Sequence, residues 1–315
     1  MPWFFQSVRF RFGVIGLALC WLAATPAKAA HVLIVKASEA EPYTQAETAL
    51  RNRLVELHHD VRSAVIKELE EKGVAAGVGN AQVVVAVGTP SARWLHKQLP
   101  ANVRLVYCMV TNVENTGLLS GAESWGVTTD VTIAEQIRII SEALPRARVL
   151  GMLYRSDTPD ARRGLEAIEQ YLPPTWRLAA VAVNEHPSMA AAIDALIQKN
   201  VDVIWTTADQ KVYDTASVRA LLLAGLRGKI PVWGYSPPFV RAGALLGVGV
   251  EPRGQGAQAA EIVERLLAGQ AGGADKAQPP REFQVAVNLI VAKQLGLEIP
   301  ESLTRRAAYV FRPEN

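Results

Sequence analysis

Short runs of apolar residues alternate along the chain with longer stretches in which apolar residues recur at helical spacing. The clearest run is Val83–Val87, and a segment that is apolar on both faces is typical of a strand buried in a parallel sheet. Gly88 ends this run, and the helical stretch Ala92–Gln98 follows it. Strands that alternate with helices of about 10–15 residues predict parallel sheets with crossover helices. The expected strands are His31–Lys36, Val83–Val87, Val103–Val110, Val149–Tyr154, Leu178–Val183, Val203–Thr206, Ile230–Tyr235 and Ala244–Val250.

Two of the expected helices begin with capping-box spacing. Thr44 is followed by Glu47, and Thr132 by Glu135, so that each pair can satisfy the free N–H groups of a first turn. The further expected helices are Ala64–Lys72, Ala92–Gln98, Ala161–Tyr171, Ser188–Lys199, Ala216–Leu226, a helix lined by Ala257, Ala260, Val263 and Leu267, and a tail helix from Asn288 that ends near Pro300.

A strand–turn–helix–strand unit occurs twice. The first copy contains Val83–Val87 and the second begins at Val201, and in both the strand ends in small polar residues. The predicted fold class is therefore α/β, with two Rossmann-like lobes of parallel sheets flanked by helices. The expected segments are a leader at 1–29, a first lobe at 30–125, a second lobe at 126–246, a return to the first lobe at 247–280 and a C-terminal return to the second at 281–315.

The first 29 residues have the pattern of a secretory signal. Arg9 and Arg11 precede the uncharged apolar run Phe12–Ala24, which is too short to span a hydrocarbon core of about 30 Å. Ala27-Lys28-Ala29 supplies small residues at the two positions that a signal peptidase reads, which predicts cleavage after Ala29 and a periplasmic location. Cys20 offers lipidation as an alternative, but the bulky Leu19 precedes it where a lipid-attachment motif has a small residue.

Charge and cysteine content narrow the function classes. The formal net charge is +3, and three of the 33 cations lie in the leader, so the rest of the chain is neutral against its 30 acidic residues. Nucleic-acid binding, which needs a basic face, is therefore not expected. Removal of the leader leaves Cys108 as a single cysteine, which we interpret as a buried, unreactive thiol. The sequence contains no nucleophile elbow, phosphate loop or metal-ligand spacing, so we expect neither catalysis nor a cofactor or metal.

Candidate ligand-binding residues lie where the expected strands end, because open α/β sheets bind ligands at the carboxyl ends of their strands. Thr89 and Ser91 begin a helix, where free N–H groups favour a carboxylate. Asp157 and Asp209 suit an amino group, although an acid in such a place also caps helices. A tyrosine that ends a strand can stack on a ring or simply pack in the core. The full candidate set is Ser38, Thr89, Ser91, Tyr154, Asp157, Asp209 and Tyr235.

Several motifs resemble one family. They are Gly88-Thr89-Pro90-Ser91-Ala92, Gly126-Val127-Thr128, the stretch from Leu144 to Tyr154, Lys229-Ile230-Pro231-Val232 and the tail from Asn288 to Pro300. Together they are similar to the substrate-binding proteins of ABC importers, of the type I periplasmic binding fold, in the branch with tryptophan- and tyrosine-binding members. The resemblance implies a hinged clamshell that acts as a monomer, closes on a small solute and delivers it to a membrane permease.

Two departures from the family pattern lie at expected ligand contacts. Arg155-Ser156-Asp157-Thr158 stands where the family often has asparagines, and Asn112-Val113-Glu114-Asn115 replaces the usual Asp-Pro. The solute therefore does not follow from the resemblance. The sequence predicts an exported solute-binding protein, for an amino acid or other small carboxylate, without catalytic activity. A periplasmic sensory module and an exported two-lobed enzyme are the alternatives.

Overall fold

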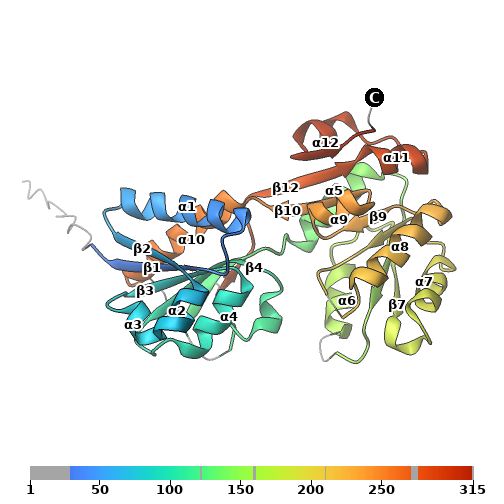
Figure 1. Ribbon diagram of the computed structural model, residues 1–315. Helices are drawn as coiled ribbons and strands as arrows, with labels where there is room; N and C mark the ends of the chain where they lie inside the picture. Colours follow the sequence, from blue (N-terminus) through green and yellow to red (C-terminus); the bar gives the residue numbers. More distant parts are fainter. Residues whose placement is uncertain (1–28, 121–122, 159–160, 210, 271–275, 314–315) are drawn as a thin grey trace, which may run out of the picture.

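The computed structural model describes residues 29–120, 123–158, 161–209, 211–270 and 276–313, which form two lobes side by side (Figure 1). Each lobe is a sheet covered by helices on both faces, which confirms the predicted α/β architecture. The expected signal segment lies outside the described residues, except for Ala29. In the described part of the chain, no helix combines the length and the apolar character needed to cross a membrane.

The first lobe has a six-stranded sheet in which every neighbouring pair of strands is parallel. Its four inner strands are mostly buried on both faces, because helices cover the sheet on either side, whereas the two edge strands are more exposed. In spatial order they are β11 (Ala277–Gln278), β5 (Ser124–Thr128), β4 (Arg104–Val110), β3 (Val83–Val87), β1 (His31–Lys36) and β2 (Asp60–Val65).

Two groups of helices enclose this sheet. On one face are α1 (Glu41–Glu56) and α10 (Pro252–Leu267), and on the other are α2 (Ile66–Lys72), α3 (Val74–Val78) and α4 (Thr89–Gln98), with the short η1 (Val113–Thr116) after β4. The backbones of α1 and α10 approach closely at Gly256, where an added Cβ would lie 2.0 Å from the carbonyl oxygen of Ala46. Cys108 is fully buried beneath them, as predicted, and burial raises the pKa of its thiol to about 12.

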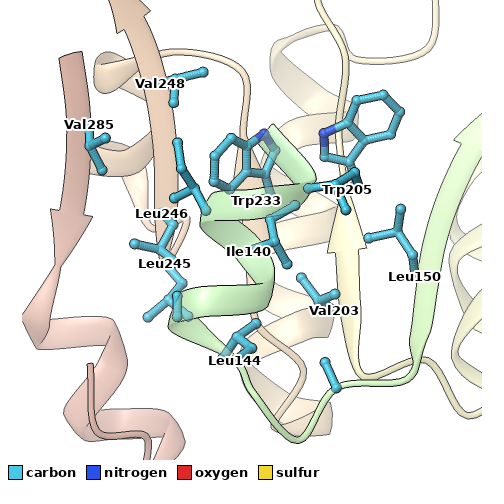
Figure 2. Close-up of a cluster of buried hydrophobic side chains, with 14 of the residues drawn as sticks. Ile140, Leu144, Leu150, Val203, Trp205, Trp233, Leu245, Leu246, Val248 and Val285 are labelled. Atoms are coloured by element: carbon cyan, nitrogen blue, oxygen red, sulfur yellow. The ribbon is translucent and has the colours of Figure 1, made fainter. Parts of the chain in front are cut away.

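The second lobe has a seven-stranded sheet that is parallel except between β10 and β12. Its core contains two tryptophans, Trp205 and Trp233, which lie beside Ile140 and Leu150 (Figure 2). In spatial order its strands are β13 (Tyr309–Phe311), β12 (Phe283–Asn288), β10 (Leu246–Val250), β9 (Val232–Gly234), β8 (Val203–Trp205), β6 (Val149–Tyr154) and β7 (Arg177–Ala182). Its helices are α5 (Ile133–Ala143), α6 (Ala161–Glu169), η2 (Val183–Glu185), α7 (Met189–Ile197), α8 (Thr215–Gly228), α9 (Pro237–Ala242), α11 (Leu289–Leu295) and α12 (Glu301–Arg306).

Three local predictions need correction. The expected helix Ala64–Lys72 is preceded by a strand, β2, so α2 begins only at Ile66. The helix with Thr44 begins three residues earlier, at Glu41, with Pro42 in its first turn, whereas the cap of Thr132 is confirmed by the bond that its side chain accepts from the N–H of Glu135. The tail contains the expected helix but continues past Pro300 into α12 and β13.

The chain passes between the lobes three times within the described residues. The crossovers join β5 to α5, β10 to α10 and β11 to β12. Because α10 and β11 return to the first lobe after most of the second has been built, each lobe contains residues that are distant in sequence.

Candidate ligand-binding cleft

A cleft of about 1100 Å³ separates the two lobes. Its lining comes from the start of α1 and the segment after β4 in the first lobe, and from the ends of β8 and β9 in the second. The crossovers form the remainder of the wall. The segment after β4 and the ends of β8 and β9 are at the carboxyl ends of parallel strands, where an open α/β sheet places its ligand site.

Two of the seven candidate residues line this cleft. Asp209 follows β8, and one of its carboxylate oxygens accepts the N–H of Lys211 at 2.9 Å. Tyr235 follows β9, and its ring contacts Phe239 edge to face at a centroid distance of 5.1 Å. Both come from the second lobe, so the structure brings together the candidates on one side only.

The candidates of the first lobe do not line the cleft. Ser91 is fully buried, and its hydroxyl donates to the carbonyls of Val87 and Gly88 at 3.0 and 2.9 Å. Thr89 accepts the N–H of Thr111 at 3.1 Å and borders a smaller hollow along α4, and Ser38 accepts the N–H of Ala40 at 3.3 Å. All three hydroxyls are therefore bonded to backbone groups of the first lobe.

Tyr154 and Asp157 also lie outside the cleft lining. Tyr154 is partly buried and packs against the core of the second lobe. The carboxylate of Asp157 is exposed and accepts two bonds from Arg155, at 2.9 and 2.5 Å. These bonds hold the pKa of Asp157 below its ordinary value, so this acid is already paired within its own turn.

A half-buried glutamine orders the aromatic wall of the second lobe. Gln136, in the first turn of α5, accepts the indole N–H groups of Trp205 at 2.8 Å and Trp233 at 3.0 Å. Its own amide group donates to the carbonyl of Val131 at 2.7 Å. Trp205 and Gln136 both line the cleft, and Figure 2 shows the two indoles side by side. The indole orientations are therefore fixed, since each buried N–H has one partner.

A second glutamine performs a similar task in the first lobe. Gln255 lies in the first turn of α10 and is 1% exposed. Its side-chain N–H donates to the carbonyl of Thr128, and its side-chain oxygen accepts the N–H of Met109, both at 2.9 Å. Met109 has a φ of 57°, in the left-handed region that a bulky residue seldom adopts, at an irregularity in the pairing of β4 with β5. Gln255 thus stabilises a strained backbone in the cleft wall.

The cleft lining is acidic. Glu41, Glu114 and Asp130 approach from the first lobe and its crossover, while Asp209 and Arg241 approach from the second. None of these five residues makes an ion pair with another described residue. Their carboxylates accept hydrogen bonds from neutral groups, such as the N–H of Asn112 for Asp130 and the side-chain amide of Gln45 for Glu41, and the charge of Asp209 also acts on Arg155. No group of three or more His, Cys, Asp or Glu side chains that could hold a metal ion exists among the described residues.

Asp130 has the most altered acidity of this set. Protein walls on both sides of the cleft raise the pKa of its carboxyl to about 6 by desolvation, and the nearby charge of Glu114 raises it further. The N–H of Asn112, which donates to this carboxylate at 3.0 Å, acts in the opposite direction. The side chain remains exposed to cleft water, so it is available to a ligand.

Sequence reasoning missed Asp130 and both glutamines. The glutamines did leave a signal: Gln136 shares a helical stripe with Ile133 and Ile140, and Gln255 lies one turn before Ala259 on a buried stripe. A polar residue on the core-facing stripe of a helix predicts a buried hydrogen-bonding role. Asp130 lies in a crossover, and its surroundings depend on how the two lobes are placed.

Two mostly parallel sheets with interleaved crossovers and a cleft between them are typical of a two-lobed binding protein. The chain belongs to the family of ABC transporter substrate binding proteins, whose family model matches residues 74–311. This match confirms the resemblance found in the sequence. A search of curated protein sequences finds no match.

Many solved structures share the fold, and three of them illustrate the similarity. A ligand-free, open substrate-binding protein with adhesive properties from Clostridium difficile is 18% identical, with a TM-score of 0.69. An ABC domain in complex with L-Trp from Streptococcus pneumonia is 17% identical, with a TM-score of 0.58. A conserved domain protein from Vibrio cholerae is 21% identical, with a TM-score of 0.56. Each comparison covers 90% of this chain and 100% of the other.

Proposed function

We propose that this protein is an exported solute-binding protein that captures a small solute between its lobes and delivers it to the permease of an ABC importer. The observation that carries this proposal is the cleft of about 1100 Å³, lined from both lobes and crossed by the connecting segments. A cavity of this size suits a small molecule. Membership of the ABC substrate-binding family supports the delivery step.

The lining favours a solute with a protonated amine. The described lining residues include four acids and Arg241 as the basic residue, and a carboxylate within about 4–6 Å of an ammonium group stabilises its charged form. We propose that, with the lobes closed, the amine lies among Asp130, Glu114 and Asp209, and that the guanidinium of Arg241 donates to a carboxylate of the same solute. Trp205 and Tyr235 then offer a flat apolar surface. The complex of a fold relative with L-Trp supports an amino acid as the first solute class to test.

The experiment is a thermal-shift screen of the purified chain, begun at Ala30, against amino acids, amines, simple carboxylates and sugars. A ligand at 100 times its dissociation constant adds about 2.7 kcal/mol of stability, which raises the midpoint by several degrees in a chain of this size. Small-angle scattering with the best solute should then show a smaller radius of gyration. A screen without any shift, or an unchanged radius at saturation, contradicts the proposal.

A further inference from the structure

The chain enters its fold through a buried residue. Ala30, directly before β1, is 2% exposed. Its carbonyl accepts the N–H of Asp60 at 2.9 Å, and its own N–H donates to Nδ1 of His59 at 3.1 Å. These contacts lie at the start of β1, the end of the first lobe turned away from β10 and β12 (Figure 1). The site is therefore remote from the cleft.

The partners of His59 define its tautomer. A backbone N–H can only donate, so Nδ1 must be the unprotonated, accepting nitrogen. The proton of the neutral ring is then on Nε2, which donates to Glu264 on α10 at 2.6 Å. The ring of His59 is 2% exposed and the side chain of Glu264 is 32% exposed. The carboxylate thus lies at the boundary between the core and water, with the imidazole between it and Ala30.

We propose that His59 and Glu264 form the binding site for the protein's own mature α-ammonium group, created when the leader is removed after Ala29. This inference rests on the proposed export. Hydrolysis breaks the Ala29–Ala30 peptide bond: the hydroxyl of water goes to the carbonyl carbon of Ala29, and its proton goes to the nitrogen of Ala30. The new amine takes up a second proton from solvent at neutral pH.

The existing geometry suits this charged group. The ammonium keeps the hydrogen bond to Nδ1 that the peptide N–H already makes, and it gains a positive charge that Glu264 balances through the imidazole. The neighbouring hydrogen bond between Nδ1 of His31 and the carboxylate of Asp60, at 2.7 Å, lies on the adjoining strand ends and does not involve Ala30. One extra residue at the N-terminus would move the charge from this site into solvent. Of the possible cleavage positions, the one after Ala29 therefore places the new ammonium group at His59.

The test compares two forms of the purified chain, one beginning at Ala30 and one at Ala29, each released from a cleavable fusion. Both are treated with an amine-acylating reagent under native conditions, and labelling of the N-terminal peptide is followed by mass spectrometry. The docked amine reacts only when this end opens, so we expect the Ala30 form to label at least roughly tenfold more slowly. Equal rates for the two forms would overturn the proposal.

Three variants of the Ala30 form separate the contacts. His59→Asn keeps an acceptor near the Nδ1 position and should retain part of the protection, whereas His59→Leu removes the acceptor and should label like the Ala29 form. Glu264→Gln alters a partly exposed residue, keeps the fold and should give an intermediate rate. Circular dichroism checks folding in each case. Full protection in Glu264→Gln contradicts the role of the carboxylate.

Two further measurements distinguish this inference from the proposed function. N-terminal sequencing of the exported protein should begin at Ala30, and any other start contradicts occupation of the site. Solute binding should be the same in the Ala30 and Ala29 forms, because the cleft lies at the other end of the lobe. A protected amine in a protein that binds no solute would overturn the proposed function alone.

Discussion

Gln136 and Gln255 hold the same crossover from opposite lobes. Gln255 donates to the carbonyl of Thr128 at 2.9 Å, and Gln136 donates to the carbonyl of Val131 at 2.7 Å. Between these two anchored carbonyls lie Thr129 and Asp130. A hinge is a short segment whose backbone dihedrals absorb the rotation of two rigid bodies. We therefore expect lobe closure to turn about Thr129 and Asp130 while both glutamine contacts persist.

Replacement of Gln255 tests the first-lobe anchor. Gln255→Leu should lower the free energy of unfolding by about 2–4 kcal/mol, because it leaves the N–H of Met109 and the carbonyl of Thr128 without partners. Urea unfolding followed by tryptophan fluorescence measures the change. The control is Gln170→Leu at an exposed position, where we expect a change within about 0.5 kcal/mol. Equal stability of the two variants would contradict the anchoring role.

Two aspartates of the second lobe provide a matched pair for ligand binding. Asp209 lines the cleft, whereas Asp157 lies outside the lining and is paired with Arg155. Asp209→Asn should weaken binding of an amine-bearing solute by about ten- to 150-fold, since a hydrogen bond to a charged group contributes about 1.5–3 kcal/mol. Asp157→Asn should bind as the parent does. Isothermal titration decides, and an unchanged affinity in Asp209→Asn would show that the amine is held elsewhere.

The raised pKa of Asp130 has a defined effect on stability. Its carboxyl binds a proton more tightly in the folded chain, so the free energy of unfolding falls as pH rises from 3.8 to about 6. Asp130→Asn removes this dependence. Urea midpoints of parent and variant, measured across that range, should therefore diverge, with the parent losing stability relative to the variant as pH rises. Profiles that run parallel through the whole range would contradict the shift.

Two helical glycines should respond in opposite directions to alanine. A Cβ at Gly256 would meet the backbone of α1 at 2.0 Å, so Gly256→Ala should force α10 away and lower stability by about 1–3 kcal/mol. Gly164 on α6 has open space around it, and Gly164→Ala should raise stability by about 0.5–1 kcal/mol. Thermal unfolding of both variants gives the comparison. A neutral Gly256→Ala would mean that the two helices can separate freely.

Sequence periodicity predicted the buried strands that are continuous apolar runs, such as Val83–Val87. It did not predict β5 and β12, which are also buried but contain Ser124, Gly126 and Gln284. It missed β2, whose alternating exposure and polar residues resemble the surface of a helix at short range. The rule about strand ends located Asp209 and Tyr235. The same rule wrongly included Ser91. Its hydroxyl donates to the carbonyls of Val87 and Gly88 and not into the cleft, and this depends on atomic geometry that the sequence does not give. Asp130 depends on lobe placement, which local patterns do not encode.

The place of α10 in the first lobe constrains the order in which the protein can fold. Ala259 and Val263 of α10 pack with Val32 and Val85 in one core, and β12 and β13 complete the other sheet. Neither hydrophobic core can therefore close before the last quarter of the chain is present. A chain that emerges from its N-terminus across a membrane would expose both unfinished cores until translocation is nearly complete, and partly emerged chains of this kind are prone to aggregate. Because the lobes are interleaved, both cores can be completed only late in translocation, and at nearly the same time.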